Sequence, residues 1–327
     1  MKIKITKAEG KVTVGILLGV LLLAMFLSLF LGSVLMSPSA LWHSDILWQI
    51  RLPRVILAAF VGLLLALSGV ILQGVLRNPL SDPYIVGFSA GAGVGAAISL
   101  ALGAQFIVFG MSSLPASAFI FSLLSVFVVY KLSQAAGKTS PETLILAGVA
   151  LSAFCGAILS LIIIISGNLQ SIYFWLLGSL SAATWSNVST VIPYAIVGSV
   201  VAYYYSKELN ALLLGEEMAL TLGVDVEKVR LVLIVTASLL TAAAVSVSGL
   251  IGFVGLIIPH WIRLIVGPNH RLLIPISALS GMILMVVTDT IARTVLSPME
   301  IPIGIIMALV GAPFFLYLLR RRRLEGQ

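Results

Sequence analysis

Long runs of uncharged, apolar residues constrain this chain more than any other feature. One run of 48 residues separates Asp82 from Lys131, and another of 64 residues separates Glu142 from Lys207. The chain is 60% hydrophobic and 9% charged, whereas soluble domains carry roughly 25% charged residues. Because backbone groups inside lipid must bond to one another, such runs are expected to form helices. The sequence therefore predicts an all-α integral membrane protein.

Ten segments are long enough to be membrane-spanning helices, which need about 20 residues each. A break near residues 103–115 divides the 48-residue run, and residues 167–185 divide the 64-residue run. The remaining spans are predicted within residues 12–36, 55–76, 231–262 (two spans), 272–293 and 301–319. Residues 167–185 are rich in Gly, Asn, Ser and Thr, so we expect a short re-entrant or surface helix there.

The number of spans depends on the stretch between Arg230 and Arg263, whose 32 uncharged residues are long for one span and tight for two. If residues 245–250 form a turn, ten spans result and sixteen of the Lys and Arg residues lie in the cytoplasm, with three outside. A single span would place eleven of these basic residues in the cytoplasm and eight outside. Membrane proteins retain basic residues on the cytoplasmic side. We therefore predict ten spans, with both termini cytoplasmic, in a single transmembrane domain of residues 1–327.

Three arginines lie on the outer side in this topology: Arg51, Arg54 and Arg293. They fall near one face of the bundle, against the general charge bias. Guanidinium groups bind carboxylates in a bidentate manner. The three arginines therefore indicate an acidic partner that docks from outside.

Several other classes of protein are disfavoured. The basic residues are scattered singly between apolar runs, so the pI near 9.7 does not indicate nucleic-acid binding. Cys155 is the only cysteine, and the three histidines are dispersed, so we expect no metal site. The sequence has neither a His-Glu-x-x-His motif nor a P-loop, and its Ser and Thr residues lack a base partner. We therefore expect no catalytic residues and no enzyme activity.

Asp289 is the only acid inside a predicted span, four residues before Arg293. This spacing places the two side chains on one helix face, so we expect them to form an ion pair. A proton-coupled secondary transporter is the alternative class, and it would need ionisable groups within the spans.

The longest cytoplasmic gap, residues 207–228, is predicted to contain a short exposed helix. Glu216 and Glu217 suit its N-terminal dipole, and Gly223 is expected to end it in a left-handed cap. Apolar Met218 and Ala219 on such a helix are typical of a docking element rather than of a solvated loop.

Separated blocks of motifs then point to a family. The first block comprises Arg51-Leu-Pro-Arg54, Gly62, Ser68-Gly69, Gln73, Asn78-Pro-Leu80, Pro83 and Gly87. The second comprises Gly252-Phe-Val-Gly255, Pro259-His260, Arg263, His270-Arg271, Asp289, Arg293, Glu300-Ile-Pro-Ile-Gly304 and Gly311-Ala-Pro313. Over residues 48–321 the chain resembles the FecCD-type permeases, the membrane subunits of ABC importers for iron-siderophores, haem and cobalamin.

The resemblance implies an assembly. It implies ten helices per subunit, pairing with a second copy or a homologous permease, two cytoplasmic ATPase subunits, and an extracytoplasmic binding protein. ATP and magnesium would be bound by the ATPase, and no cofactor by this chain.

The resemblance also implies roles for particular residues. The arginines would meet acidic residues of the binding protein, and the conduit would run between subunits along the fifth and tenth helices. Coupling helices at about residues 208–227 would contact the ATPase through Glu216, Glu217, Ala219 and Gly223. The cytoplasmic gate would lie at Asn78 and at Thr139 and Ser140. A ferric siderophore is the expected cargo, with haem and cobalamin as alternatives.

Overall fold

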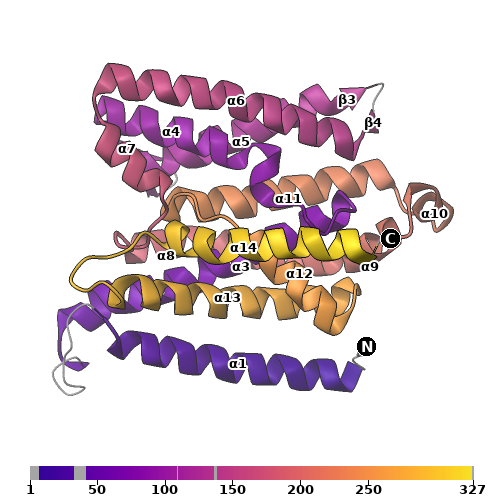
Figure 1. Ribbon diagram of the computed structural model, residues 1–327, viewed down its shortest axis with the longest axis horizontal. Coiled ribbons are helices and arrows are strands. Elements are labelled where there is room, and N and C mark those ends of the chain that lie inside the picture. Colours follow the sequence, from indigo (N-terminus) through magenta and orange to yellow (C-terminus); the bar gives the residue numbers. More distant parts are fainter. Residues whose placement is uncertain (1–6, 33–41, 109, 136–137, 326–327) are drawn as a thin grey trace.

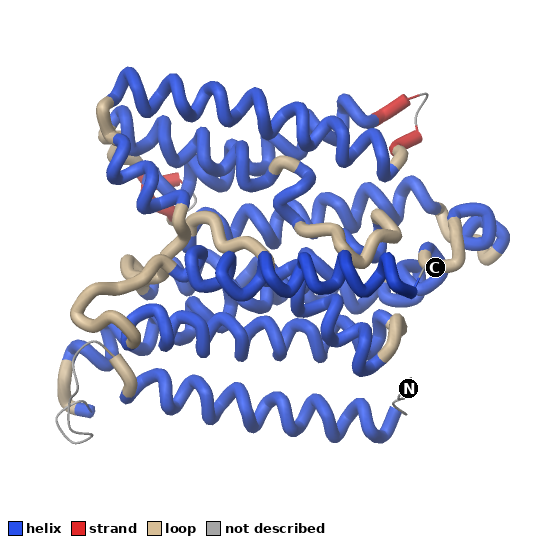
Figure 2. The backbone as a smooth tube through the Cα atoms, viewed as in Figure 1, coloured by secondary structure: helices blue, strands red, loops and turns tan. Residues whose placement is uncertain are grey.

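The computed structural model describes residues 7–32, 42–108, 110–135 and 138–325, and these residues are almost entirely helical. Figure 2 shows long helices running side by side, with strands confined to two short pairs. The strand pairs are β1 (Ile107–Val108) with β2 (Met111–Ser112), and β3 (Gln134–Ala135) with β4 (Lys138–Thr139); both are antiparallel.

Seven helices are long and apolar enough to cross a membrane. They are α1 (Lys7–Phe30), η1 (Ile46–Arg51) continued by α3 (Leu52–Val75), α5 (Ser113–Ser133), α6 (Pro141–Ser166), α8 (Trp185–Tyr204), α11 (Val226–Ser248) and α13 (His270–Thr294). Three further apolar helices are shorter or have a shorter apolar part: α4 (Phe88–Leu102), α12 (Val254–Val266) and α14 (Ile303–Glu325).

Each of the ten predicted segments corresponds to one of these helices. The predicted break in the ambiguous stretch is confirmed, although α11 continues to Ser248 and the break falls at residues 249–253 rather than 245–250. The expected short helix is α7 (Leu169–Leu176). Because α4, α12 and the apolar part of α14 are short for a span, the crossing of the membrane by all ten stays a prediction.

α3 is the central helix of the bundle and is buried along almost its whole length. It packs against α13 where two glycines face each other. A Cβ at Gly62 would lie 2.1 Å from the Gly281 carbonyl oxygen, and a Cβ at Gly281 would lie 2.4 Å from that of Gly62. Glycine at both positions therefore permits backbone contact between the helices, as is common in membrane proteins.

The two ends of the bundle differ in what they carry. Figure 1 shows the start of α1 and the end of α14 at the same end of the bundle as α9 (Ser206–Leu212) and α10 (Glu216–Thr221), which we call the α10 end. At the opposite, η1 end lie η1, α7 and the connection from α13 to α14. The first and last described helices thus begin and end at the same end of the bundle, and the cytoplasmic location of the termini stays a prediction.

Candidate functional sites at the two ends of the bundle

The three arginines predicted to lie outside are brought together at the η1 end. Arg51 ends η1, Arg54 lies in the first turn of α3, and Arg293 lies in the last turn of α13. All three are buried, with exposed fractions of 5%, 6% and 4%. A buried guanidinium group is stable only when its charge and N–H groups are satisfied.

Two acidic side chains, those of Asp289 and Glu300, accept hydrogen bonds from the Arg54 guanidinium group and neutralise its charge. Its Nε donates to both carboxylate oxygens of Asp289, at 3.0 and 3.2 Å, and its Nη2 lies 2.9 Å from Oδ1. Its Nη1 donates to Glu300 Oε1 at 2.9 Å. Arg293 Nε lies 3.5 Å from Asp289 Oδ2, which confirms the predicted ion pair. The sequence did not predict that Arg54 also binds the Asp289 carboxylate.

The other guanidinium groups hold the end of α1. Arg51 donates to the carbonyl oxygens of Leu29 and Phe30, at 2.7 and 3.1 Å. Arg293 donates to the Ser28 carbonyl at 2.6 Å and also to the Ser28 hydroxyl. The last carbonyls of a helix have no partner within the helix, so these bonds cap α1 and fasten it to α3 and α13.

The docking hypothesis treats the three guanidinium groups as free to meet an acidic partner. The structure instead bonds each of them within the chain. Two described acids pair with these arginines: Asp289 is buried, whereas 32% of the Glu300 side chain is exposed.

At the α10 end, Glu216 anchors α10 to the bundle. Its Oε1 lies 2.6 Å from Nη2 of the buried Arg230 and 3.2 Å from Nη2 of Arg77. Arg230 also pairs with Glu227 at 2.6 Å. The acid at the helix start therefore has a structural partner as well as a favourable dipole.

The predicted left-handed cap at Gly223 is confirmed. Gly223 has φ +81°, its N–H donates to the Leu220 carbonyl at 2.9 Å, and the Val224 N–H donates to the Ala219 carbonyl at 3.0 Å. These are the two bonds of a Schellman motif.

α10 presents a mixed surface to solvent. Glu217 is exposed together with Met218, Leu220 and Leu222, whose exposed fractions are 53%, 59% and 60%; we call these four residues the α10 face. Ala219 is fully buried, so it supports α10 from inside and does not belong to this face.

The residues predicted for the gate also lie at turns. Asn78 accepts a bond from the Leu80 N–H through Oδ1 at 3.0 Å. Ser140 caps α6 by accepting from the Thr143 N–H at 3.2 Å. Thr139 lies in β4, and its side chain falls outside the described part of the structure.

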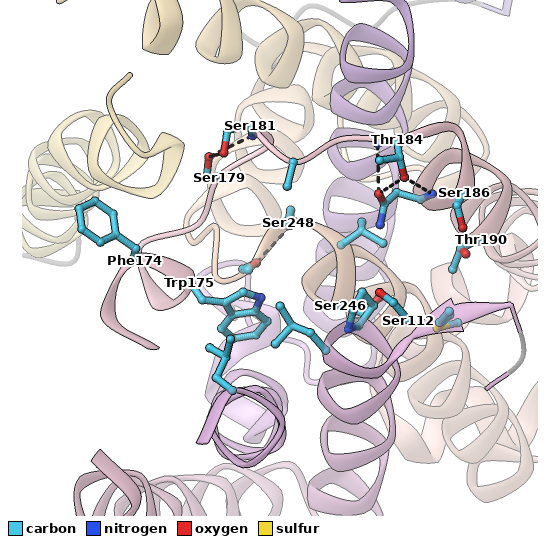
Figure 3. Close-up of a pocket in the computed structure, with 18 of the residues that line it drawn as sticks. Ser112, Phe174, Trp175, Ser179, Ser181, Thr184, Ser186, Thr190, Ser246 and Ser248 are labelled. Carbon is cyan, nitrogen blue, oxygen red and sulfur yellow. Dashed lines mark hydrogen bonds between the residues drawn. The ribbon is translucent and has the colours of Figure 1, made fainter. Parts of the chain in front are cut away.

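A cavity of about 740 Å³ opens at the η1 end between α7, α8 and the end of α11. Figure 3 shows its labelled side chains around a common space, with Trp175 on one side and Ser186 and Thr190 on the other. Ten lining residues are Ser, Thr or Asn, and Glu300 also contributes to the wall. The cavity was not predicted from the sequence, although the polar composition of residues 167–185 was a signal for it.

Comparisons with known proteins agree with this architecture. A family model described as the FecCD transport family matches residues 20–321. The cobalamin import system permease protein BtuC of Halobacterium salinarum is 48% identical, with alignment over 86% of this chain and 75% of that protein. The hemin transport system permease protein HmuU of Yersinia pestis is 39% identical, over 97% of this chain and 98% of its own.

A solved structure extends the likeness to three dimensions. It belongs to an ABC transporter assigned to the metal-chelate type, in an inward-facing conformation, with 36% identity and a TM-score of 0.84 over 95% of this chain and 99% of that one. The chain therefore belongs to the FecCD transport family and is a multi-pass protein of the cell membrane.

Proposed function

We propose that this chain is the permease subunit of an ABC importer and forms the translocation path for a bulky metal chelate. Its membership of the FecCD family over residues 20–321 is the observation that carries the proposal. The described bundle supports it, since seven helices are long and apolar enough to cross a membrane and most of the side chains buried between them are apolar.

The chain would work in a larger assembly. A second permease, either identical or homologous, would complete the path along α6 and α14, which expose apolar side chains such as Phe154, Ile164 and Leu309. Two ATPase subunits would bind at the α10 end and would hold the ATP and magnesium, so this chain would need neither a cofactor nor a catalytic site.

The ATPase contact would involve the α10 face. Glu217 and the three exposed apolar side chains would meet the partner directly, while Glu216, Ala219 and Gly223 would hold α10 in place. Movement of the ATPase would then reach the bundle through α10, because Glu216 is bonded to Arg230 and Ala219 is buried against the bundle. Residues Asn78, Thr139 and Ser140 would form the cytoplasmic gate at the same end.

An acidic binding protein would dock at the η1 end by exchange of carboxylates. Arg54 is already occupied, but one of its two acids, Glu300, is partly exposed. A carboxylate of the partner would replace Glu300 on Nη1 of Arg54, while Asp289 keeps the guanidinium in place. Arg51 and Arg293 would position the site and add positive potential, which accelerates the approach of an acidic partner.

The cargo would be an iron chelate, foremost a ferric siderophore. Haem and cobalamin are the alternative cargoes. Both are supported by relatives that are named for hemin transport and for cobalamin import.

Uptake measurements test this function. The permease would be reconstituted in vesicles with its ATPase and binding-protein partners, and labelled ferric siderophore, haem and cobalamin would be supplied with ATP. Accumulation of one of the three is expected. Failure of all three to accumulate, in vesicles that contain the complete assembly, would contradict the proposal.

A further inference from the structure

The cavity at the η1 end has a neutral polar lining. Of its described lining residues, ten carry hydroxyl or amide groups, none is Lys, Arg or His, and Glu300 is the only one with a charge. The Glu300 carboxylate is bonded to Arg54 at 2.9 Å, so its charge is already compensated.

The hydroxyl groups are able to bind a ligand. Ser246 and Ser248 donate to carbonyl oxygens of their own helix, at 2.9 and 2.8 Å, which leaves their oxygens as acceptors. The hydroxyl groups of Ser112, Ser171 and Thr190 make no hydrogen bond to another described residue, although their backbones belong to β2, α7 and α8. The cavity thus offers both donors and acceptors, without a fixed charge that would select an ion.

Aromatic groups complete the wall. Phe174 and Trp175 come from α7, and Figure 3 shows the Trp175 indole beside the hydroxyl-lined space. A few convergent polar groups beside aromatic surface are typical of sites for small organic ligands.

We propose that this cavity is a subsite for the uncharged, oxygen-rich part of the cargo, such as hydroxyl, amide or hydroxamate groups. The inference rests on the proposed transport function and narrows it to a class of substrate. A carboxylate buried here would find no cation to replace its hydration, whereas a neutral group exchanges hydrogen bonds with water for hydrogen bonds with serine. The subsite therefore favours neutral chelates over chelates that carry free carboxylates. Because each such bond adds little net affinity, the cargo can also leave.

Equilibrium binding tests the subsite without any partner protein. Full-length permease in nanodiscs of neutral lipid would be titrated with a labelled neutral ferric trihydroxamate, with ferric citrate and with haem, and empty nanodiscs would give the background. We expect the neutral chelate to bind at least about tenfold more tightly than either anionic one. Quenching of Trp175 fluorescence, isolated with Trp175→Phe, would place the chelate in the cavity.

Variants sharpen the test. The double substitution Ser179→Ala and Ser181→Ala should weaken binding of the neutral chelate by about threefold to tenfold, as expected for lost hydrogen bonds. Thr190→Lys adds a cation to the wall and should improve binding of ferric citrate relative to the neutral chelate. Ser189→Ala is the matched control, because Ser189 neighbours Thr190 on α8, donates to the Ser186 carbonyl and does not line the cavity.

Two results would overturn the subsite. Either the anionic chelates bind as tightly as the neutral one, or the serine variants bind like Ser189→Ala. Both results leave ATP-driven uptake of a chelate in vesicles possible, whereas the absence of any uptake contradicts the transport function itself.

Discussion

Arg54 binds the Asp289 carboxylate through two guanidinium nitrogens in the buried centre of the η1 end. Nε and Nη2 lie 3.0 and 2.9 Å from Oδ1, and the Asp289 side chain is almost completely buried. The two residues are 235 positions apart in the sequence. Their ion pair therefore joins the start of α3 to the end of α13 and makes the arginine cluster a structural element before any partner binds.

The first prediction concerns the stability of this pair. Asp289→Asn leaves the buried charges of Arg54 and Arg293 without their shared carboxylate, so it should destabilise the protein by about 3–5 kcal/mol. Thermal unfolding of the purified protein in detergent measures the loss. Glu300→Gln is the control and should cost no more than about 1 kcal/mol, because its side chain is partly exposed. Equal melting temperatures for Asp289→Asn and the wild type would contradict the structural role.

The second prediction concerns docking at the same cluster. Glu300→Gln removes the competing carboxylate from Arg54, so the cognate binding protein should bind about threefold to tenfold more tightly. Arg54→Glu should abolish binding at low salt, where charge screening is weak. Surface plasmon resonance on the reconstituted permease gives both affinities. If Glu300→Gln leaves the affinity unchanged, the partner does not dock by exchange of carboxylates on Arg54.

The third prediction concerns the α10 face. The double substitution Met218→Ser and Leu222→Ser removes exposed apolar surface without disturbing Ala219 or the Gly223 cap. Uptake and substrate-stimulated ATP hydrolysis should fall at least about tenfold, since each buried apolar side chain contributes about 1.5–3 kcal/mol to an interface. Leu132→Ser is the control, because this exposed leucine lies in the last turn of α5, directly before β3, which Figure 1 shows at the α10 end. Normal stimulation in the double variant would count against α10 as the coupling element.

The fourth prediction concerns pH. Asp82 precedes η2 (Pro83–Val86), outside the long helices, and accepts from the Tyr84 N–H at 2.8 Å. Burial raises the pKa of the Asp82 carboxyl from 3.8 to about 6, against the opposing effect of hydrogen bonds from the backbone of Tyr84 and Phe253. Between these two values the folded protein holds a proton that the unfolded chain releases.

The stabilisation from this proton is complete below pH 3.8 and is lost as the pH rises through 6. Melting temperatures should therefore fall between pH 4.5 and 7 in the wild type. Asp82→Asn keeps the acceptor for Tyr84 but does not titrate, so its profile should be flatter. Parallel profiles for the two proteins would show that Asp82 is not responsible.

The sequence predicted the parts of the fold that follow from local chemistry. Uncharged runs located the helices, and charge bias separated α11 from α12. Gly223 predicted the left-handed cap at the end of α10, because a positive φ favours glycine. The Asp289–Arg293 pair followed from helix periodicity.

The sites that join distant segments were not predictable in the same way. The charge bias places Arg54 on one side of the membrane. It does not show whether Asp289 and Glu300 lie close enough to neutralise the guanidinium group in a buried position. The burial of Ala219 depends on how α10 packs on the bundle. The cavity is assembled from the ends of several helices, so no single segment of sequence contains its pattern.

ATP-dependent transport in vesicles distinguishes an ABC importer from a proton-coupled transporter. Vesicles containing the complete assembly would be loaded with ATP, or left without it, and labelled chelate uptake would be followed with and without a protonophore. We expect uptake that requires ATP and survives collapse of the proton gradient. Uptake that does not depend on ATP and stops with the protonophore would show a proton-coupled transporter instead of an ABC importer.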